Sequence, residues 1–482
     1  MSDTQPQPGG QPGGQPGGRR AAVARRRRVD VLVALAVTMP AVVALAFGAI
    51  GDQESRLAGP QPPTTAELTS ATVVCPGGIR PTSATRVGRT PGVAGGELSV
   101  QVAPPDGAEA SAGAPLTAGA DGTAVVPDSA GPVVLDGRGA AAPGIAAGRD
   151  DPLALPECRT PAYDEWLVGL GATARYATTL ELVNPDDGEA VVDVALYGAE
   201  GPVEEPALRG IQVPAHGVQR VDLAASAPRR EITAARVSVT RGRVAVTART
   251  TRDQLGRGRA TTDFLPTQAA PSTENLILGL PEGARGATLF VANPGDDEVR
   301  ARVRLVTSEA TFTPTEAPDV SVPPHALQEV DLRPLLAGEG GAGVVGVVVE
   351  SADPLAASVR LVSRKDLVLL APAIAVREPT ATVLPTGEKT LLLGHALRTG
   401  VVHVTSYGAD GSLLREDPVE VAPDRAASLA LPPEAVLVTV EPRNTRIAGV
   451  VSLPTAGSQP GLATLRLRAA ETHARIPVVS PE

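Results

Sequence analysis

A phrase near the middle of the chain, Val213–Leu223, returns 109 positions later as Val322–Leu332. Asn184-Pro185 returns at the same offset as Asn293-Pro294, and a looser copy of the phrase begins at Val421. A period near one hundred residues is too long for solenoid repeats or propeller blades, which recur every ~20–50 residues. It matches a whole β-sandwich domain of the immunoglobulin class, which has ~100 residues. The chain is therefore expected to hold tandem duplicated domains.

The repeated segments alternate polar and apolar residues with the period of two that is typical of half-buried β-strands. Thr179–Val183 and Val191–Leu196 flank an Asn-Pro-Asp-Asp-Gly turn and are predicted to form one hairpin. Ala235–Val239 and Val244–Ala248 are predicted to form a second. Hardly any segment outside one apolar run shows a sustained helical period. The sequence predicts an all-β body of tandem immunoglobulin-like β-sandwich domains after a single N-terminal transmembrane helix.

The domain boundaries follow from the copies and from shifts in composition. The chain has 482 residues, enough for three or four domains. The expected divisions are a disordered basic tail (1–30), a transmembrane helix (31–50), a linker (51–70), a degenerate β domain (71–160), two immunoglobulin-like repeats (161–265 and 272–378), a shorter repeat (380–456) and a C-terminal tail (457–482). Each repeat is expected to stand as a compact bead.

The N-terminal region predicts a membrane anchor. Residues 1–30 carry six arginines against Asp3 and Asp30, a net charge of +4, and Val31–Ile50 is free of charge. That run is about long enough to cross a bilayer, and the arginines before it place the N-terminus in the cytoplasm and the body outside. The alternative is a cleaved signal peptide with its site at Ala44–Ala46. Both interpretations export the body.

The charge and the cysteines indicate which partners are disfavoured and which compartment is expected. The net charge of −10 leaves −14 for residues 31–482, because the first 30 carry +4. An acidic body disfavours nucleic acid, whose binding proteins show a basic patch. The two cysteines, Cys75 and Cys158, lie in the exported part, where an oxidising compartment permits a disulfide between them. The alternative is two unrelated free thiols.

The polar clusters at the turns are only weak signals of a metal-binding site. Asn184–Glu189 and Asn293–Glu298 could ligate calcium through carboxylates, but they lack the EF-hand spacing. The alternative is a turn in which Asn and Asp bond their own backbone. His216 and His325 hold equivalent places in separate copies and are expected to be turn residues, because zinc needs ligands that converge. With no hydrolase, Walker or zincin motif in the chain, no catalytic, cofactor or metal site is predicted.

Three aromatic residues, Tyr163, Trp166 and Tyr176, are candidate interaction residues. They lie within fourteen positions in a chain that has only 2% aromatics, and aromatic side chains dominate binding hot spots and stack on sugars. The alternative is a core role, since Trp166 corresponds to Leu276 in the next copy. Exposure of Trp166 and Tyr163 would favour polysaccharide binding, and burial would weaken it.

One combination of features resembles a known family. A basic tail and one apolar run precede Cys75-Pro76, then Cys158 with Trp166–Gly169, then Leu182–Pro185 and Tyr197-Gly198. This combination resembles domain-of-unknown-function family 5719, an uncharacterised actinobacterial family of membrane-anchored envelope proteins. The likeness covers most of residues 70–455. It implies an envelope protein with no assigned activity, cofactor or site residues, and Leu167 departs from the Phe or Trp that members commonly have.

These features predict a non-enzymatic, membrane-anchored extracytoplasmic protein that acts as a spacer or protein-interaction scaffold in the bacterial cell envelope. The alternative is a cell-wall polysaccharide-binding protein. The expected partners are the membrane, through one span, and either envelope proteins or wall polysaccharide. Neither a cofactor nor nucleic acid is expected.

Overall fold

The computed structural model describes residues 38–40, 42–43 and 64–476, with gaps at 81–82, 94, 104–113, 119–121, 127–130, 151–153, 285, 364 and 456–460. The predicted basic tail, most of the predicted span at 31–50 and the linker up to residue 63 lie outside the described residues. Among the residues that are described, no helix is long and apolar enough to cross a membrane. Residues 65–474 form one compact body, and its elements are almost all β-strands.

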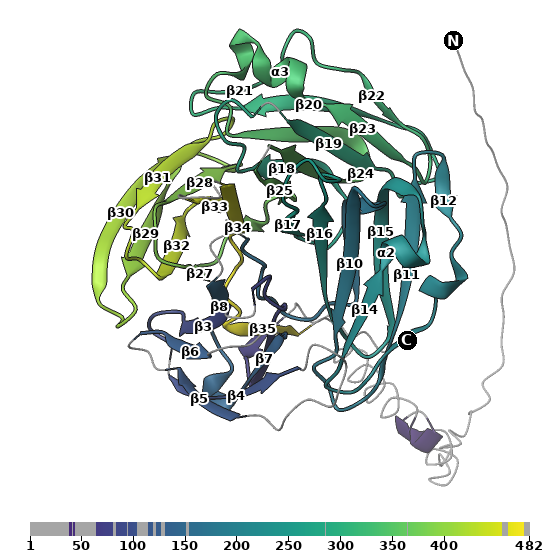
Figure 1. Ribbon diagram of the computed structural model, residues 1–482. Coiled ribbons are helices and arrows are strands. Elements are labelled where there is room, and N and C mark those ends of the chain that lie inside the picture. Colours follow the sequence, from purple (N-terminus) through teal and green to yellow (C-terminus); the bar gives the residue numbers. More distant parts are fainter. Residues whose placement is uncertain are drawn as a thin grey trace, which may run out of the picture. The chain divides into compact units, whose positions relative to one another are not determined.

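The body consists of four pairs of antiparallel sheets, here called the first to fourth sheet pair (Figure 1). The first pair joins β2 (Ser70–Cys75), β7 (Val133–Arg138), β4 (Gly96–Val102) and β5 (Ala114–Ala118) in one sheet and β6 (Ala124–Val126), β3 (Ala84–Arg89) and β8 (Ile145–Asp150) in the other. The second pair joins β9 (Asp164–Ala172), β15 (Arg230–Arg241), β11 (Ala190–Gly198), β12 (Gly201–Val203) and β13 (Ile211–Val213) on one side and β14 (Val218–Asp222), β10 (Tyr176–Val183), β16 (Ala245–Arg252) and β17 (Thr261–Leu265) on the other.

The remaining two pairs follow along the chain. The third pair joins β18 (Ser272–Leu278), β20 (Val299–Val306), β21 (Thr311–Phe312) and β22 (Val320–Val322) to the first half of β24 (Gly346–Val362), and β19 (Ala287–Ala292), β23 (Leu327–Asp331) and β25 (Leu367–Leu370) to its second half. The fourth pair joins β27 (Thr380–Val383), β32 (Leu437–Arg443), β29 (Gly400–Tyr407) and β30 (Leu413–Val421), and, in the other sheet, β31 (Ala427–Leu431), β28 (Lys389–Gly394), β33 (Ile447–Thr455), β34 (Gly461–Arg466) and β26 (Ala375–Val376). Short elements complete the chain: β1 (Thr64–Glu67) with β35 (His473–Ile476), α2 (Leu223–Ser226), α3 (Arg333–Ala337), η1 (Gly139–Ala141), η2 (Pro206–Leu208) and η3 (Glu339–Gly341).

All four pairs share one strand order. If the main strands of a pair are numbered along the chain, one sheet reads 1-6-3-4 and the other 5-2-7, and an eighth strand follows the seventh in the last three pairs. In the third pair the single strand β24 provides both the sixth and the seventh strand, so its two sides form one continuous eight-stranded sheet. In the second pair β9 and β10 are joined at Ala172 and Ala177, so its two sides form one nine-stranded sheet. The repeat in the sequence is therefore a repeat of topology. The first pair has the same strand order although its sequence is only a degenerate copy of the repeat.

The two predicted hairpins are wrong. β10 pairs with β14 and β16, while β11 pairs with β13 and β15, so strands adjacent in sequence lie on opposite sides of the second pair. The chain crosses the core at each Asn-Pro turn instead of folding back within one sheet. Alternation and turn residues indicate where strands end and the chain reverses, but they do not say which strand becomes the hydrogen-bonded neighbour.

Each sheet pair encloses its own core of aliphatic side chains. Strand β11 alternates as predicted, with Val192, Val194 and Leu196 buried and Asp193 and Ala195 facing outwards. The same period appears in β20. Separate apolar clusters fill the four pairs. Because aromatics are scarce, Val, Leu and Ala supply the burial, at about 1.5–3 kcal/mol for each fully buried Val or Leu side chain.

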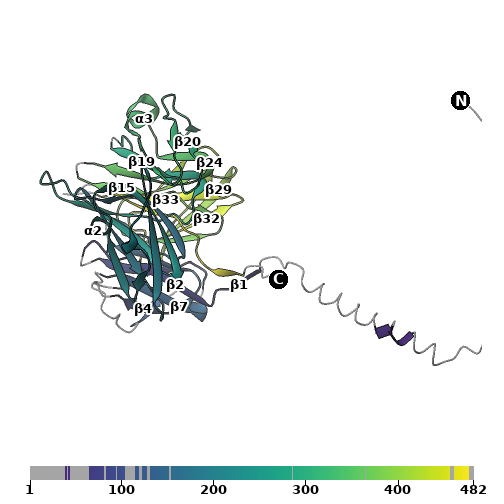
Figure 2. The ribbon, with the colours of Figure 1, turned by 90° about the vertical axis from the view of Figure 1, so that its right-hand side faces the viewer.

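The sheet pairs do not stand as separate beads. Each contacts the next through apolar side chains, and the fourth returns to contact the first, which makes a closed cycle (Figure 1). Figure 2 shows the same body turned by 90°. The contacts are Val74 and Val134 with Val183 and Val218, Trp166 and Val168 with Phe290 and Leu327, Leu276 and Val348 with Ala426 and Val450, and Ala146 with Val383 and Leu437. At the last junction a Cβ on Gly148 would lie 2.4 Å from the carbonyl oxygen of Val383, so the backbones approach closely there.

The expected C-terminal tail from residue 457 also needs correction. Strand β34 lies inside it and pairs with β33 as the eighth strand of the fourth pair. Its apolar residues alternate, with Ala463 and Leu465 buried. The short run behind a Gly- and Pro-containing stretch resembles a tail in sequence, yet it completes a sheet.

Candidate functional site

A disulfide anchors the linker between the first two sheet pairs. Cys75 ends β2, and Cys158 lies in that linker; the expected bond joins them across 83 positions of sequence. Next to it, Val74 and Arg159 exchange two backbone hydrogen bonds of 2.8 and 2.9 Å. The linker is thus held to the edge of β2 both covalently and by a short antiparallel ladder.

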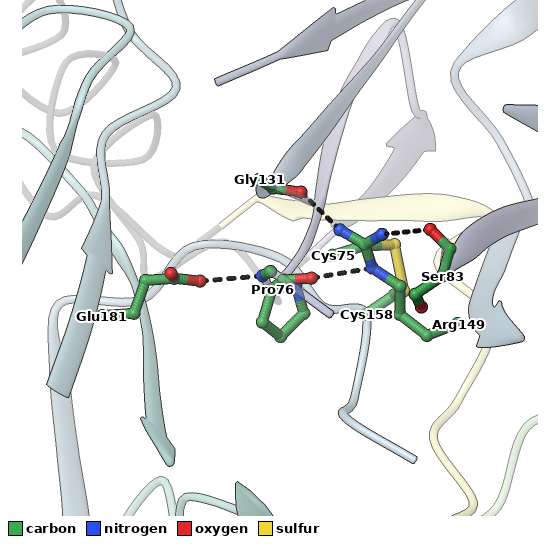
Figure 3. Close-up of a disulfide and its surroundings, with 8 residues drawn as sticks. Cys75, Pro76, Ser83, Gly131, Arg149, Cys158 and Glu181 are labelled. Carbon is green, nitrogen blue, oxygen red and sulfur yellow. Dashed lines mark hydrogen bonds between the residues drawn. A yellow bond between two sulfur atoms is a disulfide. The ribbon is translucent and has the colours of Figure 1, made fainter. Parts of the chain in front are cut away.

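A buried arginine fixes the backbone around this disulfide. The Arg149 guanidinium is almost fully buried and donates hydrogen bonds to the carbonyl oxygens of Pro76 (2.7 Å), Ser83 (3.2 Å) and Gly131 (2.6 Å) (Figure 3). The backbone N–H of Gly77, the residue after Pro76, donates to the Glu181 carboxylate on β10 at 2.8 Å. The surroundings of the disulfide therefore connect the first pair to the second.

The same linker carries Glu157 into a buried ionic cluster that we call the linker hub: Glu157, Thr267, Pro372, Arg466 and Arg468. Arg466 donates two hydrogen bonds to the Glu157 carboxylate, at 2.6 and 2.7 Å, and Arg468 donates two more, at 2.6 and 3.2 Å. Arg466 also donates to the carbonyl oxygens of Pro372 and Thr267, both at 2.8 Å. Because these residues come from all three linkers and from the end of β34, one cluster ties the four sheet pairs together.

The electrostatics of the hub favour a fixed ion pair. Burial alone would raise the pKa of Glu157, but the charges and hydrogen bonds of Arg466 and Arg468 outweigh it and hold the pKa well below its usual range. A second buried pair, Arg159 with Glu165, joins the cluster through the Thr267 hydroxyl. A cavity of about 260 Å³ beside the hub is lined by these charged groups and by several alanines. Its ionised side chains already have partners, so we interpret the hub as structural.

A cavity of about 460 Å³ lies elsewhere, between the turn before β25 and the start of β34. Its walls are Pro281, Glu282, Gly283, Ala284, Gly286, Leu361, Val362, Ser363, Asp366, Val368, Gly461 and Leu462. We call it the Asp366 cavity. Largely apolar cavities of ~300–1,000 Å³ with few polar groups are typical of small-ligand sites.

Asp366 has an unusual environment for a carboxylate. It accepts a 2.8 Å hydrogen bond from the Leu462 backbone N–H, and burial raises its pKa to about 6. Burial also raises the pKa of nearby Asp263 on β17 well above its usual range, and the charge of Asp366 adds to the rise. Among the described residues no Lys, Arg or His forms an ion pair with either carboxylate.

The structure does not gather the three candidate aromatic residues at one surface. Trp166 and Tyr176 are 4% and 6% exposed, whereas Tyr163 is 65% exposed. Trp166 packs against Tyr197 with 5.2 Å between ring centroids, within the apolar junction of the second and third pairs. Tyr176 lies below the Arg360 guanidinium, 4.2 Å from its ring centroid. Two of the three rings therefore serve packing.

The Asn-Pro turns are built by hydrogen bonds. The buried Asn184 amide donates to the carbonyl oxygens of Gly188, Val213 and Pro214, and Asn293 makes the same three bonds in the next copy. His216 and His325 both have a left-handed φ of 51° and bond the nearby carboxylates of Asp187 and Asp296 at 2.7 and 2.8 Å. No group of three potential metal ligands occurs within the described part of the chain.

Sequence reasoning missed Glu157, Arg466, Arg468 and Asp366. The alternation of Leu465 and Leu467 around Arg466 could have signalled a strand with a charged residue on its other face. Nothing local marks Glu157 as its partner, because 309 positions separate the two residues. Asp366 has no sequence signal, since its environment comes from a strand of the next sheet pair.

The model of one protein family matches residues 116–432, about two thirds of the chain, and its description is a family of unknown function (DUF5719). The chain belongs to this family. The predicted resemblance is thereby confirmed, while the actinobacterial origin stays a prediction. The match begins at β5 and ends just after β31, so DUF5719 covers parts of all four sheet pairs. No curated protein matches the chain.

Proposed function

We propose that this DUF5719 protein is a non-enzymatic, membrane-anchored scaffold of the actinobacterial cell envelope, whose body lies outside the membrane. The linker hub is the observation that supports a scaffold. It joins three linkers and the fourth sheet pair through Glu157, Arg466 and Arg468. Surfaces on different sheet pairs therefore keep a fixed spacing, as a scaffold requires.

Three further observations agree with this proposal. The disulfide favours an exported body, because disulfides persist in oxidising compartments. The uncharged run 31–50 behind four arginines favours an anchor with a cytoplasmic N-terminus. Two antiparallel sheets around one core, repeated every ~100 residues, favour an immunoglobulin-like sandwich for each pair.

The partner is proposed to bind at an exposed sheet edge. β5 and β30 are edge strands of the first and fourth pairs. β30 carries the charged residues Arg415, Glu416, Asp417 and Glu420, and charges on an edge strand discourage pairing with another chain. Each of the two strands contains one proline, but β5 has the uncharged sequence Ala-Pro-Leu-Thr-Ala. An added partner strand would supply backbone hydrogen bonds to β5.

The test is photo-crosslinking in living cells that produce the anchored chain, with the crosslinker in place of the exposed Thr117 on β5. The matched control places it at the exposed Glu420 on β30. We expect one envelope protein to be captured from Thr117 and not from Glu420. Capture of wall glycan alone would favour the polysaccharide interpretation and overturn the scaffold, as would equal capture of many proteins from both positions.

A further inference from the structure

The third and fourth sheet pairs, which lie side by side in Figure 1, enclose a cavity of about 240 Å³ between them. We call it the Arg446 cavity, and its border includes Arg304, His395, Leu397, Arg425 and Arg446. We propose that it binds a short aliphatic carboxylate, with the carboxylate group at Arg446 and the aliphatic body against the apolar part of the walls. This site goes beyond the scaffold function and does not depend on it.

The repeat provides an internal comparison for this cavity. A cavity of about 330 Å³ lies at the preceding junction, between the second and third pairs, and is bordered by Tyr197 and His325. The offsets of the repeat align these two residues with Val306 and Asp424, which border the Arg446 cavity. At the preceding junction the rings of Tyr197 and His325 stack with 6.4 Å between their centroids. The Arg446 cavity therefore has an aliphatic side chain where the preceding cavity has an aromatic ring.

The two cavities also differ in charge. Among the described residues that border the preceding cavity, three are acidic and one is an arginine. Three arginines and two acids border the Arg446 cavity. One of these arginines, Arg304, is already paired, because Glu350 and Asp424 lie 2.5 and 3.8 Å from its guanidinium nitrogens. The preceding cavity would therefore repel a carboxylate, and any attraction in the Arg446 cavity must come from the other two arginines.

Arg425 and Arg446 have no acidic partner. The second acid at the border, Glu274, lies 3.6 Å from the Nε2 of His395. Within the part of the chain that the structure describes, neither Arg425 nor Arg446 forms an ion pair with an Asp or Glu. Two guanidinium charges at one cavity are thus available to an anionic ligand.

Arg446 also has an unused hydrogen-bond donor. Its Nη2 lies 3.2 Å from His395 Nε2, but its Nε is buried and has no hydrogen-bond partner among the described residues. A buried donor without a partner is costly, and a guanidinium group can donate to both oxygens of a carboxylate. His395 itself has a left-handed φ of 55°, which is uncommon outside glycine and recurs at functional sites. A bound carboxylate would satisfy the Arg446 Nε–H.

The remaining walls suit an aliphatic group. Leu276, Val306 and Val348 line the cavity and belong to the apolar cluster that joins the third and fourth pairs. Leu397, which also borders it, is 57% exposed. Cavities that combine apolar walls with a few polar groups are typical small-ligand sites. An aliphatic body placed there would leave water and gain free energy in proportion to its buried surface.

The test uses three probes that share one chain length: hexanoate, 1-hexanol and hexylamine. Binding of each probe to the full-length protein in detergent is measured by calorimetry. We expect hexanoate to bind about tenfold or more tightly than the other two, the range of one charge-assisted hydrogen bond. Arg446→Gln should lose that advantage and leave the 1-hexanol affinity unchanged. The matched control is Arg443→Gln, which removes an exposed arginine that pairs with Glu441, and it should bind like the wild type.

A second variant keeps the test decisive if Arg446→Gln does not fold. Arg425 is exposed and has no ion pair within the described residues, so Arg425→Gln should unfold in urea like the wild type. It should bind hexanoate about threefold more weakly, the range of an exposed charge pair. Equal binding of the three probes, no binding of hexanoate, or an unaltered hexanoate affinity in folded Arg446→Gln or, failing that, in Arg425→Gln would each overturn the proposal. None of these outcomes bears on the crosslinking at β5.

Discussion

Glu157 and Asp366 are carboxylates in similar places with opposite surroundings. Each lies where strands or linkers of different sheet pairs meet, but Glu157 receives four hydrogen bonds from two arginines, whereas Asp366 accepts from the backbone N–H groups of Leu462 and Leu367. The pKa of Glu157 is lowered, whereas the pKa of Asp366 is raised. Where arginines surround the carboxylate, it joins the sheet pairs. Where burial outweighs the backbone hydrogen bonds, the carboxylate beside the cavity favours its neutral form.

The comparison also predicts opposite effects on stability. Glu157 belongs to a buried ion pair, and removing one partner of such a pair is costly. Burial raises the pKa of Asp366, so its ionised form is disfavoured in the folded state. We therefore expect neutralising Glu157 to destabilise the fold and neutralising Asp366 to stabilise it at neutral pH.

The largest effect should follow from Glu157→Gln. The substitution leaves Arg466 and Arg468 without a counter-charge, and removal of one partner of a buried pair costs roughly 3–5 kcal/mol. Urea denaturation of the purified protein measures this loss. The control is Glu204→Gln, which breaks an exposed pair with Arg209 and should cost about 0–1 kcal/mol. Equal losses in the two variants would mean that the hub does not hold the sheet pairs together.

A somewhat smaller effect is expected for the double substitution Cys75→Ser and Cys158→Ser. Removing a disulfide typically costs about 2–4 kcal/mol. Because Cys158 lies next to Glu157, the free linker should also weaken the hub. Adding Glu157→Gln to the double substitution should therefore reduce stability by less than the sum of the two separate losses, because contacts within one network are not additive. A strictly additive result in denaturation curves would show that the disulfide and the hub act independently.

The sequence was sufficient for the period, the β class and the cysteine pair. The Val213–Leu223 phrase and the alternation in β11 arise from local physics, because each strand must place one face in the core. The equal geometry of Asn184 and Asn293 shows why the repeat persists: each side chain satisfies three buried carbonyl oxygens.

The sequence was not sufficient for strand partners or for the closed cycle. β10 and β11 follow one another along the chain, yet they do not pair and lie on opposite sides of the second sheet pair. Glu157 and Arg466 meet only after all four pairs have formed. Such contacts depend on the tertiary arrangement and leave no periodic signal in the chain. Trp166 illustrates the same limit, because its ring is buried by Phe290 and Leu327 of the next pair.

The smallest expected effect is a difference between Asp366 and Glu157 in how their contributions to the free energy of unfolding depend on pH. The unfolded pKa of Asp is about 3.9, and the folded pKa of Asp366 is about 6. The folded state therefore holds the proton more tightly, and its stability decreases as pH rises from about 4 to about 6. Glu157 has a lowered folded pKa, so its contribution is present above the unfolded value of about 4.3 and is lost as pH falls below it.

Denaturation of the wild type and Asp366→Asn at pH 4, 5, 6 and 7 should thus give free energies of unfolding whose difference grows with pH, with the variant the more stable. In the same series the wild type should be more stable than Glu157→Gln, by a difference that shrinks towards pH 4. The pKa of Asp263 is also raised, and its contribution cancels from the Glu157→Gln difference. In Asp366→Asn the charge that adds to the raised pKa of Asp263 is lost, which changes the stability difference in the same direction. A gap at Asp366 that stays constant from pH 4 to 7 would mean that this carboxylate is already compensated, and the comparison with Glu157 would fail.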